Sequence, residues 1–244
     1  MADYREDQIQ YGSEVQTRAG FDEGLRSYML GIYNYMALGI AGTAIVTMLV
    51  GSSPAFLNAV AGMPWLFFLL IIGASMFGPS LIMNSQSTTV GHVAFWGYCA
   101  LWGIAISPLV VFYLATNPQI VVQAFAITAA LFGAMSLLGY TTKKNLSGIG
   151  QFAAMALIGV IIAAVVNYLL IGSGFFSFLI SCAVVLLISA ITAWETQEIK
   201  AMYRAGDSSN IATRKSIFGA FLLYGSFISM FVHVLQILGF MSSE

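Results

Sequence analysis

Charged side chains are scarce in this sequence. Only 8% of its 244 residues are Asp, Glu, Lys or Arg, whereas 59% are hydrophobic, and the mean hydropathy is +0.87. Soluble domains carry roughly a quarter charged residues, so this inventory cannot cover a protein of this size with a water-facing surface. The composition excludes an ordinary soluble protein and predicts an integral membrane protein.

Cysteine and histidine are also scarce, which removes several kinds of chemistry. Cys99 and Cys182 stand alone inside apolar runs, so we interpret them as small buried residues. His92 and His233 are far apart in the sequence, and HExxH, GxSxG and P-loop motifs are absent. The Gly-Ala-Ser at 73–75 matches part of an intramembrane serine-protease motif but lacks the Gly that should follow. We therefore expect no enzyme activity and no bound cofactor.

Long hydrophobic runs, by contrast, are abundant. A helix that crosses a bilayer needs about 20 mostly apolar residues. Seven runs approach or exceed this length: 28–50, 65–83, 90–113, 119–140, 150–171, 174–194 and 216–240. The residues before them are polar and of mixed charge, without the order of a signal peptide. We expect an all-α membrane protein with a polar tail at 1–26, a seven-helix transmembrane domain at 27–240 and a short C-terminal tail at 241–244.

The basic residues all fall on one side of this seven-span arrangement. They precede the first span or lie in the loops after the fourth and sixth spans: Arg5, Arg18, Arg26, Lys143, Lys144, Lys200, Arg204, Arg214 and Lys215. Cytoplasmic loops carry an excess of Lys and Arg, so we expect a cytoplasmic N-terminus and a C-terminus outside. Because this topogenic role accounts for the basic loops, we expect no nucleic-acid partner.

One acidic residue closes an apolar run. Glu195 lies where the sixth predicted span meets the cytoplasm, and Glu198 follows three residues later on the same helical face. Ionisable side chains at membrane depth usually face a cavity or a partner. One interpretation is a proton-sensitive or cation-attracting pair at a pore mouth. The other is an interfacial carboxylate that is solvated by water and neutralised by lysines of the neighbouring loops.

A polar stripe runs along the last span. Ser226, Ser229, His233 and Gln236 are spaced by three, four and three residues, so they share one face of a helix that is otherwise apolar. Such a stripe should face other helices rather than lipid. It predicts either interhelical hydrogen bonds or one wall of a hydrated path, with His233 able to exchange a proton.

Four segments resemble the Bax inhibitor-1 (TMBIM) family. WETQEIK at 194–200 is similar to that family's YDTQxIK-type element, and GYTTKKNLSGIGQF at 139–152 is similar to its Lys-containing segment before the fifth helix. LYGSFISMF at 223–231, followed by LQILGF at 235–240, resembles its LYLDFINLF…LLRLFG pattern. The resemblance covers nearly the whole hydrophobic part. It implies six helices around a more central seventh, with the N-terminus in the cytosol.

The resemblance also implies a site. Bacterial family members are described as pH-sensitive calcium-leak proteins, in which an acid on the sixth helix shares a proton with one on the seventh. An Arg near the end of the second helix holds the closed state. Glu195 matches the first acid, but Ser226 stands where the second would be, and the Arg position falls near Ser85. Glu198 replaces the missing acid only if the helix end turns inward.

Two functions therefore remain open. The first is a pH-sensitive calcium or cation leak in the cell's inner membrane, with Ca²⁺ as the permeant ion and Glu195 as its contact. Its ion- or proton-sensing residues would be Glu195, Glu198, Ser226, Ser229 and His233. The second is a regulatory role. The protein would lie in the lipid bilayer, and its N-terminal tail would bind another membrane protein, such as the membrane-bound AAA+ protease that some family members modulate.

Overall fold

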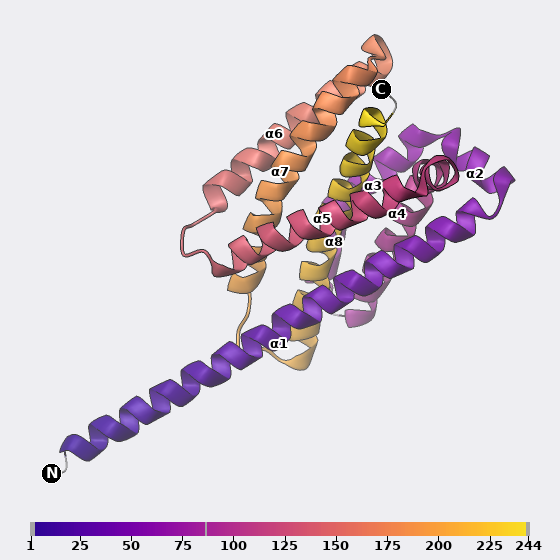
Figure 1. Ribbon diagram of the computed structural model, residues 1–244. Coiled ribbons are helices and arrows are strands. Elements are labelled where there is room, and N and C mark those ends of the chain that lie inside the picture. The colour runs from indigo at the N-terminus through magenta and orange to yellow at the C-terminus, as the bar shows by residue number, and fades with distance from the viewer. Residues whose placement is uncertain (1–2, 86, 243–244) are drawn as a thin grey trace.

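Nearly all of the described chain is helical. The computed structural model describes the backbone of residues 3–85 and 87–242, and side chains from residue 23 onward within those ranges. No strand occurs in these segments. The helices, shown in Figure 1, are α1 (Asp3–Gly51), α2 (Pro54–Ala61), α3 (Pro64–Asn84), α4 (Thr88–Thr116), α5 (Pro118–Thr141), α6 (Ser147–Val166), the π-helical turn η1 (Asn167–Ile171), α7 (Gly174–Ala201) and α8 (Ser209–Met241).

Seven helices are long and apolar enough to cross a membrane, as the sequence predicts. They are Glu23–Gly51 of α1, then α3, α4, α5, Ser147–Ile171 (α6 continued by η1), α7 and α8. The helices extend beyond the predicted runs mainly where polar residues continue the helix, as at the end of α7 and the start of α8. Apolar patterning marks the membrane core, whereas helical structure continues into the polar interface.

The short helix α2 lies in the connection after the first span. Ser53 caps it by accepting a hydrogen bond from the Phe56 backbone N–H, with 3.5 Å between N and Oγ, and Pro54 occupies the first turn. The polar N-terminal segment is helical as well, since α1 begins at Asp3 and continues without a break into the first span. In Figure 1 this end of α1 projects beyond the other helices.

Helix α8, the seventh span, lies at the centre of the bundle. It packs against α1, α3, α4, α5 and α7. In its most apolar stretch 67% of the residues are buried, compared with 6% for the α6–η1 span. A helix that is apolar on all sides fits such a central position. The structure confirms that the seventh span is central, but only five of the other spans pack against it, whereas the α6–η1 span lies outside and packs against α7.

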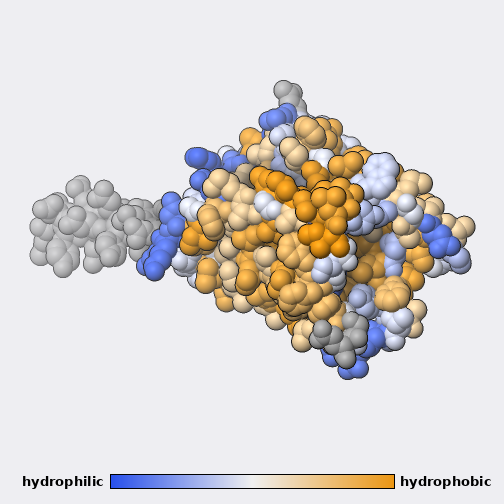
Figure 2. Space-filling view, turned by 90° about the horizontal axis from the view of Figure 1, so that it is seen from above, coloured by the Kyte–Doolittle hydropathy of each residue, from blue (hydrophilic) through white to orange (hydrophobic). Residues whose placement is uncertain are grey.

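The outer surface of the bundle is strongly hydrophobic. Figure 2 shows apolar residues across the middle of one face, with hydrophilic residues mainly toward its edges. Large apolar side chains on this surface are well exposed: Phe77 by 71%, Leu186 by 72% and Leu170 by 81%. Soluble monomers rarely expose contiguous apolar patches of this extent, so this surface is suited to contact lipid.

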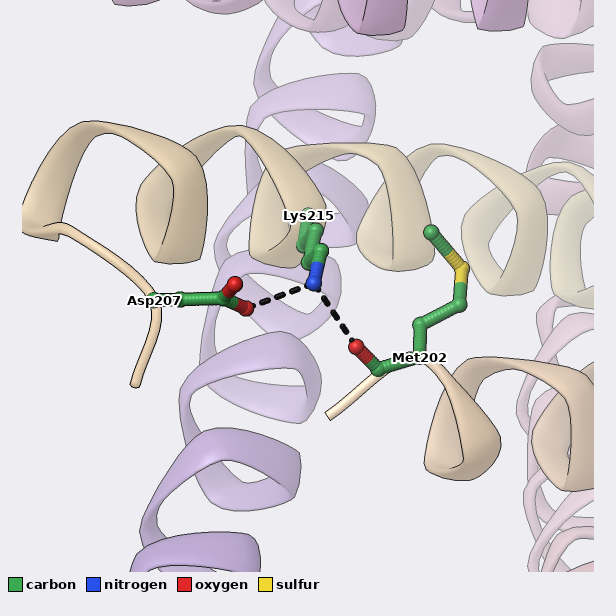
Figure 3. Close-up of polar contacts among 3 residues, drawn as sticks. All are labelled: Met202, Asp207 and Lys215. Carbon is green, nitrogen blue, oxygen red and sulfur yellow. Dashed lines mark hydrogen bonds and ion pairs between the residues drawn. The ribbon is translucent and has the colours of Figure 1, made fainter. Parts of the chain in front are cut away.

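The turn between α7 and α8 is fastened by an ion pair. Lys215 Nζ lies 2.5 Å from Asp207 Oδ2 and donates a hydrogen bond to the Met202 carbonyl oxygen at 2.9 Å (Figure 3). Both charged side chains are largely buried. Because Lys215 belongs to α8 and Met202 is the C-cap residue of α7, this contact fixes where α8 enters the bundle.

Candidate functional site

Glu195 and Ser226 meet where α7 packs against α8. Ser226 Oγ donates a hydrogen bond to Glu195 Oε2 at 2.7 Å. Ser226 is buried and Glu195 is partly buried. Among the residues whose side chains are described, no Lys or Arg lies within ion-pair distance of Glu195. The carboxyl group is therefore held by a neutral hydroxyl and is free of a cationic partner in this part of the chain.

A close approach of α5 to α7 supports this arrangement. A Cβ atom at Gly139 would collide with the backbone carbonyl oxygen of Ala193, so only glycine permits the helices to approach this closely. Ala193 lies two residues before Glu195, so this contact holds in place the turn of α7 that carries the carboxyl group.

A chain of hydroxyl groups lies beside the site. Ser136 Oγ of α5 is 3.0 Å from Thr196 Oγ1 of α7 and 2.5 Å from Tyr33 Oη of α1. Thr196 directly follows Glu195. The sequence analysis missed this chain because each hydroxyl stands alone in its own span, without a stripe or motif. Only the packing of three helices brings them together.

Glu198 does not join Glu195 at Ser226. Its Oε1 accepts hydrogen bonds from Ser147 Oγ and Trp194 Nε1, each at 3.2 Å, and its side chain is exposed. Ser147 begins α6, where a carboxylate is favoured by the partial positive charge of the helix N-terminus. Glu198 thus faces α6, and the inward turn required for it to replace the missing acid is not seen.

The remaining polar residues of the 194–200 element fasten the α5–α6 connection. Gln197 accepts a hydrogen bond from the Leu146 N–H at 2.8 Å and donates one to the Lys144 carbonyl oxygen at 2.9 Å. Lys200 Nζ donates to the Tyr140 carbonyl oxygen at 2.8 Å and lies 4.7 Å from the centre of the Tyr140 ring. Lys200 is therefore directed at α5 and does not pair with Glu195.

The predicted polar stripe on α8 divides between two places. Ser226 contacts Glu195, whereas His233 Nδ1 lies 3.2 Å from Ser181 Oγ of α7. Ser181 in turn donates to Gln236 Oε1 at 2.9 Å. With that hydroxyl hydrogen directed at Gln236, the bond between His233 and Ser181 requires the imidazole Nδ1–H to be the donor. Ser229, between the two places, is partly buried.

A cavity of about 1090 Å³ opens beside His233, at the end of the bundle where α8 finishes. We call it the C-terminal vestibule. Its walls include Tyr113, Ser177, Ser181, His233 and Gln236, and none of the lining residues that the structure describes is Asp, Glu, Lys or Arg. The described wall of the vestibule thus combines apolar side chains with uncharged polar groups, to which water can hydrogen-bond.

The π-helical turn η1 shapes one wall of the vestibule. Asn167 is buried there, donates to Ser177 Oγ at 2.8 Å and accepts from the Ser173 N–H at 3.1 Å. Gly172 closes the turn with φ +66°, a conformation that favours glycine. π-Helical turns occur frequently at functional sites, and this one links α6 to α7 at the edge of the cavity.

Apolar side chains separate the Glu195–Ser226 contact from the Ser181–His233 contact. On α7, Val184 and Ile188 lie between Ser181 and Glu195 at helical spacing, and both are buried. Phe132 of α5 and Phe227 of α8 are buried too, with ring centres 5.5 Å apart in an edge-on arrangement. The α5–α7–α8 interface is thus polar at the vestibule, apolar in the middle and polar again at Glu195.

The described side chains offer no ready-made metal cage. No group of three or more His, Cys, Asp or Glu residues in this part of the chain could hold a metal ion. Ca²⁺ takes six to eight oxygen ligands, whereas Glu195 and Ser226 supply few. This geometry can attract a cation but does not build a high-affinity resident site.

Fold and site together define a multi-pass, seven-span membrane protein with a lone acid against its central helix. The family model described as "Inhibitor of apoptosis-promoting Bax1" matches residues 25–243. This chain belongs to that family, the Bax inhibitor family, as the resemblance in the sequence indicates.

Relatives match over nearly their whole length. The inner membrane protein YbhL of Escherichia coli is 35% identical over 232 residues, which cover 93% of this chain and 95% of YbhL. An uncharacterized protein of Rickettsia prowazekii, RP147, is 35% identical and covers 90% and 92% of the two chains. An uncharacterized protein of Deinococcus radiodurans is 37% identical and covers 87% and 90%.

Proposed function

We propose that this protein is a pH-sensitive leak for cations, with Ca²⁺ as the principal permeant ion, in the inner membrane. The observation that carries the proposal is the partly buried Glu195, which accepts a hydrogen bond from Ser226 on the central helix and has no described cationic partner. A carboxyl group placed this way attracts a cation when ionised and loses that attraction when protonated.

The arrangement of the three helices supports a path for the ion. The C-terminal vestibule reaches His233 and Gln236 from one end, and Glu195 lies beyond the apolar middle of the same interface. In this structure the path is closed by buried apolar side chains. The leak that we propose therefore conducts cations only after α5, α7 or α8 shifts.

The orientation that we propose places the N-terminus in the cytoplasm. Lys143 and Lys144 of the α5–α6 connection and Arg204 of the α7–α8 connection lie at the end of the bundle from which the N-terminal part of α1 projects (Figure 1). Basic residues mark the cytoplasmic side. Glu195 would then face the cytoplasmic half of the membrane, and the C-terminal vestibule would open to the outside.

The experiment is Ca²⁺ flux into liposomes that contain the purified protein, from pH 5 to pH 8. We expect wild-type flux to vary gradually with pH, because a single acid titrates alone rather than as a coupled pair. Glu195→Gln should remove that dependence. Glu198→Gln is the matched control, since it alters an exposed carboxyl group that lies three residues from Glu195 and bonds to α6.

A flux that is equal in wild type and Glu195→Gln across this pH range contradicts the proposed role of Glu195. Absence of flux from well-folded wild-type protein contradicts the leak itself. In that case attention moves to the second function, regulation of another membrane protein.

The helical extension of α1 favours that second function. Its backbone projects past the other helices in Figure 1 and precedes the first span, which begins at Glu23. A membrane-bound AAA+ protease, or another membrane complex, is the proposed partner. Deletion of residues 1–20 should abolish co-purification of the partner while thermal unfolding of the bundle stays unchanged, and retention of the partner would exclude the segment as its binding site.

A further inference from the structure

We propose that a pocket between α1 and α8 binds the phosphate-bearing headgroup of an anionic phospholipid at the membrane surface. The pocket lies at the end of the bundle where α8 begins, whereas the C-terminal vestibule lies where α8 finishes. The proposed leak does not depend on this site, and the site does not depend on the leak.

The first observation is the cavity itself, which has a volume of about 370 Å³. We call it the α1–α8 pocket. Its walls include Ser27 and Gly31 of α1, Arg204 of the α7–α8 turn, and Thr213 and Ser216 of α8. Sites for small ligands typically measure roughly 300 to 1,000 Å³. The pocket therefore has room for a small polar headgroup, while the rest of a lipid would have to lie outside it.

The second observation is open space on the α1 wall. A Cβ atom at Gly31 would meet no other atom within 4 Å, whereas a Cβ atom at Gly24, two turns earlier, would collide with Tyr203 Oη. Helix α1 thus packs tightly against the α7–α8 turn at Gly24 and stands clear of its neighbours at Gly31. A ligand can occupy this space without displacing a described side chain.

The third observation is an uncompensated positive charge. Arg204 is exposed and forms no ion pair with any side chain that the structure describes. Asp207 also lines the pocket, but Lys215 Nζ lies 2.5 Å from its carboxylate and compensates its charge (Figure 3). The planar guanidinium of arginine matches the geometry of a phosphate group. Arg204 is therefore available to bind one.

Further donors line the same pocket. Ser27 is exposed, and Thr213 and Ser216 are partly exposed, so a ligand can reach all three hydroxyl groups. Hydroxyl groups of this kind commonly donate hydrogen bonds to phosphate oxygens. Helix α8 begins at Ser209, and Ala212 of its first turn borders the pocket. The partial positive charge of a helix N-terminus also favours an anion.

The depth of the pocket favours a lipid over a soluble anion. The first span begins at Glu23 and the seventh at Ser209, so the pocket lies beside the first turns of both. In the orientation proposed above, this is the cytoplasmic surface, where basic pockets between transmembrane helices bind anionic headgroups. Leu38 follows Gly31 two turns later on the same face of α1 and is 58% exposed. It offers an acyl chain an apolar surface that continues from the pocket.

The first test compares lipids on the purified full-length protein in detergent by native mass spectrometry. Wild type should bind one phosphatidylglycerol at least tenfold more tightly than phosphatidylcholine, whose own cation compensates its phosphate. Arg204→Gln should weaken phosphatidylglycerol binding about tenfold. Arg26→Gln is the matched control, because Arg26 is an exposed arginine of α1 outside the described wall of the pocket. Equal affinities for both lipids, or equal effects of the two substitutions, overturn the site.

The second test fills the pocket from α1. Gly31→Leu should lower the affinity for phosphatidylglycerol at least fivefold, because its side chain takes the space of the headgroup. Gly133→Leu is the matched control: a Cβ atom there also meets nothing within 4 Å, but Gly133 lies on α5. If Gly31→Leu does not fold, Ser27→Leu fills the same pocket from an exposed position. Wild-type affinity in the folded variant overturns the pocket as the binding site.

The third test separates a lipid from free phosphate. Phosphatidylglycerol should raise the thermal unfolding temperature of wild type but not that of Arg204→Gln, and inorganic phosphate should raise neither. An equal, Arg204-dependent rise with inorganic phosphate alone assigns the pocket to a soluble ligand and overturns the lipid. None of these measurements uses Ca²⁺ flux, so failure of the proposed leak and failure of this site give different results.

Discussion

Arg214 of α8 donates a hydrogen bond to the backbone carbonyl oxygen of Met83 at 3.2 Å, and also bonds to that of Ser85. The central helix is thereby tied to the last turn of α3, whose carbonyl groups have no partners within their own helix. The resemblance places an Arg near Ser85 in the calcium-leak members. In this chain an arginine reaches the same place from a different helix.

Replacement of Arg214 by Gln should loosen this tie. Hydrogen bonds from charged donors contribute about 1.5 to 3 kcal/mol, and we expect a loss near the lower value because the contact is only partly buried. Thermal unfolding in detergent measures the loss, and flux assays should show a higher Ca²⁺ leak at pH 7. Arg26→Gln, which alters an exposed arginine of α1, serves as the control. An unchanged Ca²⁺ leak in Arg214→Gln would show that this contact does not hold the leak closed.

A second acid at Ser226 should convert a gradual pH response into a steep one. Ser226→Asp places another carboxyl group within hydrogen-bond reach of Glu195, and two such acids share a proton and titrate as a coupled pair. Loss of the shared proton leaves two like charges together, so this variant should be less stable at pH 8 than at pH 6. Ser226→Asn adds a side chain of similar size without the charge. Parallel pH profiles for the two variants would contradict the coupling.

The contact between Gly139 and Ala193 should tolerate no side chain. Gly139→Ala forces α5 and α7 apart, and overpacking of this kind costs about 1 to 3 kcal/mol. Gly133→Ala is a matched control on the same helix, since nothing lies within 4 Å of a Cβ atom there and alanine favours helix. The thermal unfolding temperature should therefore fall for Gly139→Ala only. Flux in that variant reports whether the Glu195 turn has also moved.

Gln197 should protect the α5–α6 connection from proteolysis. Gln197→Ala removes two hydrogen bonds to the backbone of this connection, each contributing about 0.5 to 1.5 kcal/mol. Local opening should rise at least about fivefold, and trypsin cleavage after the exposed Lys143 and Lys144 should accelerate accordingly. Glu198→Gln alters the adjacent residue without touching that backbone. Equal cleavage rates in the two variants would show that other contacts hold the connection.

The sequence predicted the spans well because lipid imposes a simple rule on length and hydropathy. Each of the seven apolar runs became a helix, and the central position of α8 followed from the family resemblance. Helix α2 was not anticipated, because eight residues that begin with Pro54 and end before Gly62 carry a weak signal. The helical continuation of α1 through the polar N-terminal segment was not anticipated either.

The candidate site was only partly predictable. Glu195 and Ser226 could be paired by the motifs that flank them, and the structure places them in contact. The division of the α8 stripe could not be foreseen, since it depends on where Ser181 of α7 falls opposite His233. The hydroxyl chain of Tyr33, Ser136 and Thr196 gave no sequence signal, because only the packing of three helices brings these side chains together.

The peripheral position of α6 has a practical consequence for spectroscopy. Phe152, Met155, Ile158 and Ile162 expose more than half of their surface on this helix, and the span is the least buried of the seven. Spin labels or fluorophores attached there would disturb little of the interior. Paired with a label on the exposed Met48 of α1, they would form a ruler across the protein, able to record helix displacements during conduction without altering the residues that govern it.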